Sequence, residues 1–222
     1  MGWKASMIII ENPNDFDNEI SILKAIGKSN FKYKEETTLE ECIYPRDKSI
    51  SIGRYNGNII ISEDYQITTK TLEKADNLNL TIEEENLCKI FPNSEIVTIA
   101  CHSVINYHGY SLIKNGEKLR LKVISSDTPL IEFGQKLKEE EKLYSTSYQK
   151  EGMNFWKDET DPDKEYSEDQ LMEDFTFGIA NRRLGVYLDQ IEGDELMEKI
   201  RFNKYTKEKS GFFKRIMKLF TK

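Results

Sequence analysis

Both histidines of the chain lie in one apolar stretch, residues 96–124, near one of its three cysteines. Cys101 and His102 are adjacent, and a cysteine beside a histidine suggests nucleophilic catalysis. Neighbours on a strand point to opposite faces, however, so the pattern favours Cys101 as a buried, unreactive core thiol. The alternative is a hydrolase-type site that uses His102 with Asn106 or Ser103, with the acidic loop 145–169 as a lid.

Two patterns could bind a metal ion, but the first fails on distance and the second on residue type. On a regular strand, His102 and His108 would lie on one face but about 20 Å apart, at ~3.3 Å per residue. Read as a calcium loop from Asp161, the acidic stretch has Tyr166 where glycine is required and Met172 where the bidentate glutamate is required. The sequence therefore predicts no metal site and no cofactor.

The end of the chain differs in charge from the rest. Residues 203–222 hold seven of the 32 Lys and Arg residues and one of the 39 Asp and Glu residues. Residues 203–210 are predicted as a polar linker, and 211–222 as a basic amphipathic helix for an anionic membrane surface or a protein partner. The alternative is that this helix packs its apolar face on the protein's own sheet. The candidate contact residues are Phe212, Phe213, Lys214, Arg215, Ile216, Lys218 and Phe220.

Two Asn-Gly pairs indicate the hairpins that must position these residues. Both central residues of a type I′ turn need positive φ, which Asn and Gly tolerate. The pair at 115–116 predicts consecutive antiparallel strands at 96–106, 109–114 and 118–124, and the pair at 56–57 predicts a hairpin of 50–55 with 58–62. The first strand is apolar on both faces, which is typical of a central strand. In the third, Leu119, Leu121 and Val123 should be buried while Lys118, Arg120 and Lys122 face water.

The remaining elements follow from caps and breakers. Residues 5–11 form a short buried strand, and 28–47 and 145–169 are predicted as loops, the second long, acidic and aromatic. A helix capped by Asp15 or Asp17 should bury Ile20, Leu23 and Ile26 and end at Gly27. Capping boxes at 81–84 and 167–170 start helices that end near 91 and 185. Residues 66–79 fit either a short helix or a β-branched strand, with the helix favoured; 194–202 are predicted as a helix and 130–133 as a strand.

These elements do not follow a regular βαβ rhythm, so the predicted class is α+β, with helices on a largely antiparallel sheet. We expect one domain over residues 1–202 and a tail over 203–222. A charged content of 32% with an apolar content of 38% indicates a folded protein with a polar surface. Three widely spaced cysteines indicate a reducing cytoplasm, and the acidic body argues against nucleic acid as a partner.

Four segments carry a resemblance to a family of uncharacterised bacterial proteins: MGWKASMIII, YNGNIIISED, the run from 95 that contains CHSVINYHGY and KNGEK, and LIEFGQKL. The likeness covers roughly the first 145 residues. It implies a bacterial origin and a shared domain, and it supplies no catalytic residues.

No acid, base, nucleophile or metal set is assembled by these patterns. We therefore expect a cytoplasmic, non-catalytic binding or protein-interaction module. The alternatives are a hydrolase with a pocket around His102 and Asn106, and a peripheral protein of the inner membrane surface attached through the C-terminal helix.

Overall fold

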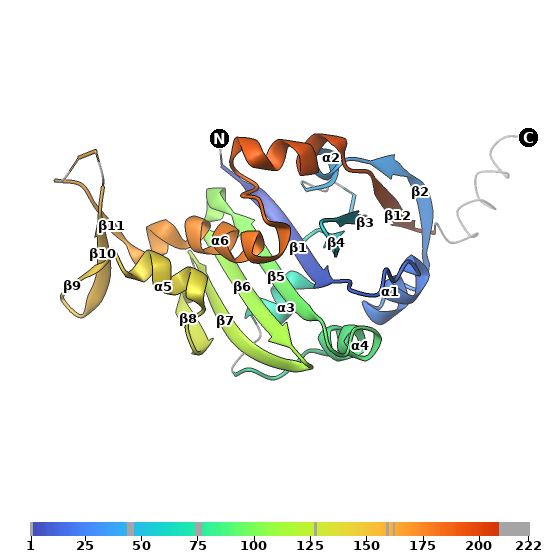
Figure 1. Cartoon of the computed structure of the whole chain (residues 1–222), viewed down its shortest axis with the longest axis horizontal. Coiled ribbons are helices and arrows are strands. Elements are labelled where there is room, and N and C mark those ends of the chain that lie inside the picture. The colour runs from blue at the N-terminus through green and yellow to red at the C-terminus, as the bar shows by residue number, and fades with distance from the viewer. Residues whose placement is uncertain are drawn as a thin grey trace, which may run out of the picture.

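A nine-stranded antiparallel sheet forms the body of the protein in the computed structural model, which describes residues 2–43, 47–73, 77–126, 128–158, 160–161 and 163–208 (Figure 1). The strand order is β2-β12-β3-β4-β1-β5-β6-β7-β8. A second sheet has the order β11-β10-β9 and projects from the side of the body. The strands are β1 (Lys4–Glu11), β2 (Phe31–Thr37), β3 (Ile50–Tyr55), β4 (Asn58–Ser62), β5 (Glu95–His102), β6 (Tyr107–Lys114), β7 (Glu117–Ser125), β8 (Thr128–Gly134), β9 (Tyr148–Lys150), β10 (Met153–Lys157), β11 (Glu165–Ser167) and β12 (Phe202–Lys207).

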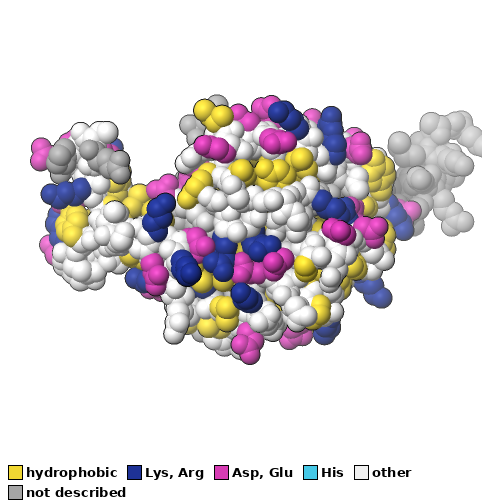
Figure 2. Space-filling view, in the orientation of Figure 1, with side chains coloured by type: hydrophobic (Ala, Val, Ile, Leu, Met, Phe, Trp, Pro, Cys, Tyr) yellow, Lys and Arg dark blue, Asp and Glu magenta, His cyan; other side chains and the backbone are white. Residues whose placement is uncertain are grey.

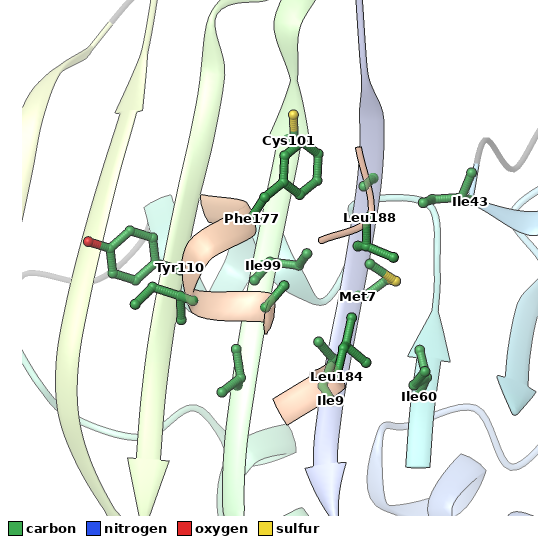
Figure 3. Close-up of a cluster of buried hydrophobic side chains, with 14 of the residues drawn as sticks. Met7, Ile9, Ile43, Ile60, Ile99, Cys101, Tyr110, Phe177, Leu184 and Leu188 are labelled. Carbon is green, nitrogen blue, oxygen red and sulfur yellow. The ribbon is translucent and has the colours of Figure 1, made fainter. Parts of the chain in front are cut away.

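Helices cover both faces of the large sheet, which confirms the α+β class. On one face α6 contributes to a core cluster with β1, β5 and β6 (Figure 3), while α1, α3 and α4 pack on the other face. None of the helices in the described ranges is long and apolar enough to cross a membrane. The α-helices are α1 (Glu19–Ala25), α2 (Leu39–Cys42), α3 (Thr68–Glu73), α4 (Ile82–Ile90), α5 (Lys138–Tyr144) and α6 (Met172–Leu184). Short helical turns are η1 (Ser103–Ile105), η2 (Glu168–Leu171), η3 (Ile191–Gly193) and the π-type η4 (Glu195–Lys199).

The two Asn-Gly hairpins are present as predicted. Asn56 and Gly57 join β3 to β4 with φ of 47° and 70°, and Asn115 and Gly116 join β6 to β7 with φ of 52° and 77°. The capping box of Thr81 with Glu84 starts α4, and positive φ at Gly185 ends α6.

The prediction of one unbroken strand over 96–106 is wrong. β5 ends at His102, the chain turns through η1, and Asn106 adopts the left-handed conformation (φ 47°, ψ 42°) before β6 begins. Asparagine tolerates this conformation better than most residues, so it allows the chain to reverse direction before β6. The turn makes β5 and β6 a hairpin in which Cys101 pairs with His108.

The predicted linker at 203–210 is also wrong over its described part, and the domain boundary at 203 falls inside a strand. β12 lies between β2 and β3, bonded to both. Its Phe202 ring lies over Gly53 of β3, where an added Cβ would come within 2.7 Å of the ring. The residues from 209 onward, including the predicted helix 211–222, lie outside the described residues.

Two stretches predicted as loops contain regular structure. Residues 28–47 hold β2 and α2, and residues 145–169 hold the whole β9–β11 sheet. β2 is an edge strand with five exposed residues in a row, which is why it lacks an apolar pattern.

The prediction that one face of β7 is exposed to solvent is wrong. Lys118, Arg120 and Lys122 are all buried, and Leu119 is 40% exposed. A bulge explains part of this: Arg120 pairs with Leu112 and Lys118 with Ile113, so Leu119 has no partner on β6. Glutamates from the covering helices pair with the three charges, which makes their burial tolerable.

Two helix predictions need correction. Asn18, not Asp15 or Asp17, caps α1, and Ile20 is 61% exposed while Ile22 takes the buried position. Residues 194–202 contain one π turn and then the start of β12, rather than a helix.

Candidate functional site

Three side chains with metal-binding or catalytic chemistry converge at the β5–β6 hairpin. Cys101 and His108 are cross-strand partners, and Glu173 reaches them from the first turn of α6. One donor atom from each lies within 4.8 Å of the other two. The Cys101 Sγ atom is 3.9 Å from Glu173 Oε2, and Figure 3 shows Cys101 next to Phe177, one helical turn after Glu173.

Ser103 fixes the carboxylate of this group. Its hydroxyl donates to Glu173 Oε2 and accepts from the backbone N–H of Trp3 at 3.0 Å. The Cys101 backbone is held from the other face, where the Tyr65 hydroxyl donates to its carbonyl at 2.6 Å. Hydrogen bonds therefore hold the Glu173 side chain and the Cys101 backbone in place.

The electrostatics of the cluster oppose a free nucleophile. Burial raises the pKa of Cys101 to about 12, and the nearby Glu173 adds to this effect. Burial also lowers the pKa of His108, although Glu173 opposes the shift. A neutral thiol beside a neutral imidazole is a poor attacking group. The prediction that Cys101 is buried is confirmed, at 0% exposure.

The candidate hydrolase residues are not brought together. His102 lies on the opposite face from Cys101, with its ring 5.8 Å from that of Tyr65, while burial and the charge of Lys4 lower its pKa. Ser103 is bonded to Trp3 and Glu173, and Asn106 is half-buried in the turn. No side-chain hydrogen bond joins any two of these candidates within the described ranges, so the geometry gives the hydrolase reading no support.

The acidic stretch serves its own loop. Asp158 accepts from the backbone N–H groups of Thr160 and Asp161 and from the Tyr166 hydroxyl. Those hydrogen bonds, first that of the Thr160 side chain, hold the pKa of Asp158 far below its usual value. The carboxylate thus stabilises the β10–β11 connection.

A pocket of about 500 Å³ opens between α5, α6 and the segment that follows α6. Figure 2 shows acidic and basic side chains gathered over these helices. The α5 wall supplies Lys138 and Lys142, and neither has an ion pair in the part of the chain that the structure describes. The rest of the lining is Glu139, Leu143, Asp174, Phe177, Gly178, Asn181, Arg182, Tyr187, Asp189 and Gln190.

The pocket lining also includes two carboxylates, Asp174 and Asp189, which have no ion pair within the described ranges. Both side chains are exposed at the surface, but partial desolvation, and then the charges of Asp189 and Glu173, raise the pKa of Asp174. Partial desolvation and Glu173 likewise raise the pKa of Asp189. Arg182 does not neutralise them, because it is bonded to Glu95 and Glu139. Among the described residues, the pocket therefore presents two ammonium groups and two carboxylates that have no ion pair.

Gly178 opens this pocket from the middle of α6. A Cβ added there would meet no atom within 4 Å outside the backbone of its own helix, so packing does not require glycine. Glycine inside a helix costs about 0.5–1 kcal/mol relative to alanine. Glycine at position 178 therefore lowers the stability of α6 and leaves open space in the pocket beside it.

The sequence-based reasoning missed Glu173 and the whole pocket. In the sequence, Glu173 looks like an ordinary acidic residue in the first turn of a helix. Its proximity to Cys101 depends on how α6 packs against the β5–β6 hairpin. Gly178 is the one local signal, because it interrupts a helix without ending it. Comparisons with protein-family models, curated proteins and solved structures find no significant match to this chain.

Proposed function

We propose that this protein is a non-catalytic binding protein whose pocket between α5 and α6 takes a small zwitterionic ligand. Gly178 is the observation that carries the proposal, since it keeps the pocket open at a cost to the helix. The charges suit such a ligand: an ammonium group would face Asp174 and Asp189, and an anionic group Lys138 and Lys142. Phe177, Leu143 and Tyr187 would contact its apolar part.

Two features support binding rather than turnover. Among the residues that the structure describes, no serine, threonine, cysteine or histidine lines the pocket. Cys101, which lies outside the pocket lining, is buried, and its raised pKa keeps the thiol protonated. A site that orients charges without a Ser, Thr, Cys or His side chain is suited to recognition.

The test is a titration of the full chain with the free L-amino acids, followed by ¹H–¹⁵N NMR at Gly178 and Asn181. We expect one or more of them to shift these two amides in the wild type and in Gly178→Ala. Gly178→Leu should abolish the shifts, because its side chain fills the pocket. If no amino acid moves these amides, or Gly178→Leu binds as well as the wild type, the zwitterion assignment is wrong.

We also propose a peripheral association for the C-terminal segment, at the anionic inner surface of a bacterial membrane or on an acidic protein partner. The supporting observation is its composition, in which apolar residues such as Phe212 and Phe213 alternate with Lys214, Arg215 and Lys218. β12 ends at Lys207, so the segment continues from an inner strand of the sheet.

A further inference from the structure

The Cys101, His108 and Glu173 cluster has the donor set of a zinc site. Thiolate, imidazole and carboxylate are the three protein ligands that Zn²⁺ takes, and three ligands with an open fourth position are typical of its non-structural sites. The three side chains come from β5, β6 and α6, so the site exists only in the folded chain.

The distances are close to those of a coordinated ion. Zn–S of ~2.3 Å and Zn–N or Zn–O of ~2.0–2.1 Å in a tetrahedron separate the ligand atoms by about 3.3–3.6 Å. Cys101 Sγ and Glu173 Oε2 are already 3.9 Å apart, and no pair of donor atoms exceeds 4.8 Å. Side-chain movements of about 1 Å would bring all three into contact with one ion.

A second observation points to a missing ligand. His108 is 4% exposed, and its Nδ1 atom is buried without a hydrogen-bond partner in the described part of the chain. Buried polar atoms are normally satisfied, and one without a partner indicates an ion or water that completes the site. The Cys101 thiol is also poorly satisfied, because its contacts are long: 3.8 Å to Ser103 and 3.9 Å to Glu173.

The surroundings resemble the supporting shell of a metal site. The Ser103 hydroxyl donates to the Glu173 carboxylate and is itself held by the Trp3 backbone. Ligating carboxylates are commonly oriented by such outer hydrogen bonds. Cys101 is fully buried while Glu173 is partly exposed, so an ion would enter from the Glu173 side.

We propose that Cys101, His108 and Glu173 bind one Zn²⁺ ion, with water or the Ser103 hydroxyl as the fourth ligand. Binding forms a Zn–S bond, and the thiol proton is released to solvent. The ion would occupy the buried space at the end of the β5–β6 hairpin. This site is separate from the pocket, whose lining contains none of the three ligands.

Metal-free full-length protein titrated with Co²⁺ and then Zn²⁺ tests the proposal. We expect one Co²⁺ per chain with a thiolate-to-cobalt band in the near ultraviolet, and its loss when Zn²⁺ displaces the cobalt. Cys101→Ser should remove the band. Glu173→Gln, which keeps the size of a partly exposed side chain, should weaken binding by more than about 100-fold, above the 10–100-fold typical of outer-shell changes.

Cys88→Ser is the matched control, because Cys88 is also buried but lies on α4 against the other face. It should bind Co²⁺ as the wild type does. The proposal is overturned if the protein binds no Co²⁺ or Zn²⁺, or if folded Glu173→Gln binds them as tightly as the wild type. Gly178→Leu should retain the metal, so failure of the pocket proposal and failure of this one are distinguishable.

Discussion

Arg120 lies inside the protein at 1% exposure, and its guanidinium is shared between two glutamates. Its Nη2 atom is 2.6 Å from Glu140, which is fully buried, and 2.5 Å from Glu132, whose side chain is 41% exposed. Arg120 also donates to the carbonyls of Phe133 and Gly134. A buried ion pair of this kind adds little stability to the fold compared with apolar residues in its place. Removing one partner, however, leaves the other charge buried without a counterion.

We therefore expect Arg120→Met to destabilise the protein by about 3–5 kcal/mol, because Glu140 is left buried without its cation. The double variant Arg120→Met with Glu140→Leu should recover most of that loss. Urea denaturation measures both. A double variant no more stable than Arg120→Met would show that the two side chains act independently.

Gly178→Ala should raise the free energy of unfolding by about 0.5–1 kcal/mol, because alanine favours the helix and its methyl group enters open space. Gly53→Ala is the opposite case, since the new Cβ would come within 2.7 Å of the Phe202 ring. It should destabilise the protein in the same denaturation experiment. A loss of stability in Gly178→Ala would mean that the space beside α6 is smaller than the structure indicates.

At the scale of elements, buried ion pairs attach helices to the sheet. Arg182 of α6 is bonded to Glu95 of β5 at 2.7 Å, and Lys122 of β7 lies 2.7 Å from Glu168 of η2. Burial alone would raise the pKa of Glu95, but the hydrogen bond and charge of Arg182 outweigh it and hold the pKa below the usual value. Lys122 and Tyr144 do the same for Glu168 against its burial.

These depressed pKa values predict acid lability. In the unfolded chain each glutamate titrates near 4.5, and in the folded protein it titrates lower. The stabilisation is therefore complete above the unfolded value and is lost as pH falls through the folded one, at up to about 1.4 kcal/mol per pH unit for each group. When the free energy of unfolding is measured between pH 7 and 3, it should fall less steeply with decreasing pH for Glu95→Gln than for the wild type. The exposed Glu35→Gln should match the wild type.

Local signals explain which elements could be predicted from the sequence. Asn-Gly turns and the Thr81–Glu84 box act over a few residues, so their elements were predicted correctly. β12 has one large apolar residue on each face, Phe202 and Tyr205, and its other residues are polar, so it reads as a linker. Hydrogen bonds to the neighbouring strands β2 and β3, rather than its own sequence pattern, hold this segment in the extended conformation. The cluster at Cys101 was missed for a related reason, because the turn at Asn106 reverses the chain without a glycine.

At the scale of the whole molecule, the position of β12 changes how the C-terminal segment must be tested. A deletion from residue 203 removes a strand bonded to both β2 and β3. A deletion from residue 209 leaves that strand in place.

We expect the chain ending at Glu208 to keep the melting temperature of the full protein and to lose sedimentation with anionic vesicles. The chain ending at Phe202 should lose several kcal/mol or fail to fold, because β2 is then detached from the sheet. Zwitterionic vesicles serve as the binding control. Unchanged sedimentation of the chain ending at Glu208 would contradict the membrane proposal, and so would a large loss of its stability.

The order in which the chain is synthesised has a consequence for the same strand. β2 and β3 are complete by Tyr55, but the strand between them begins only at Phe202. During translation the gap between β2 and β3 stays open until almost the whole sheet has emerged from the ribosome. Pairings between segments so distant in sequence form slowly, and the exposed edge of β3 can meanwhile accept a strand from another nascent chain. Strand exchange between copies is therefore the misfolding route to which this topology is most exposed.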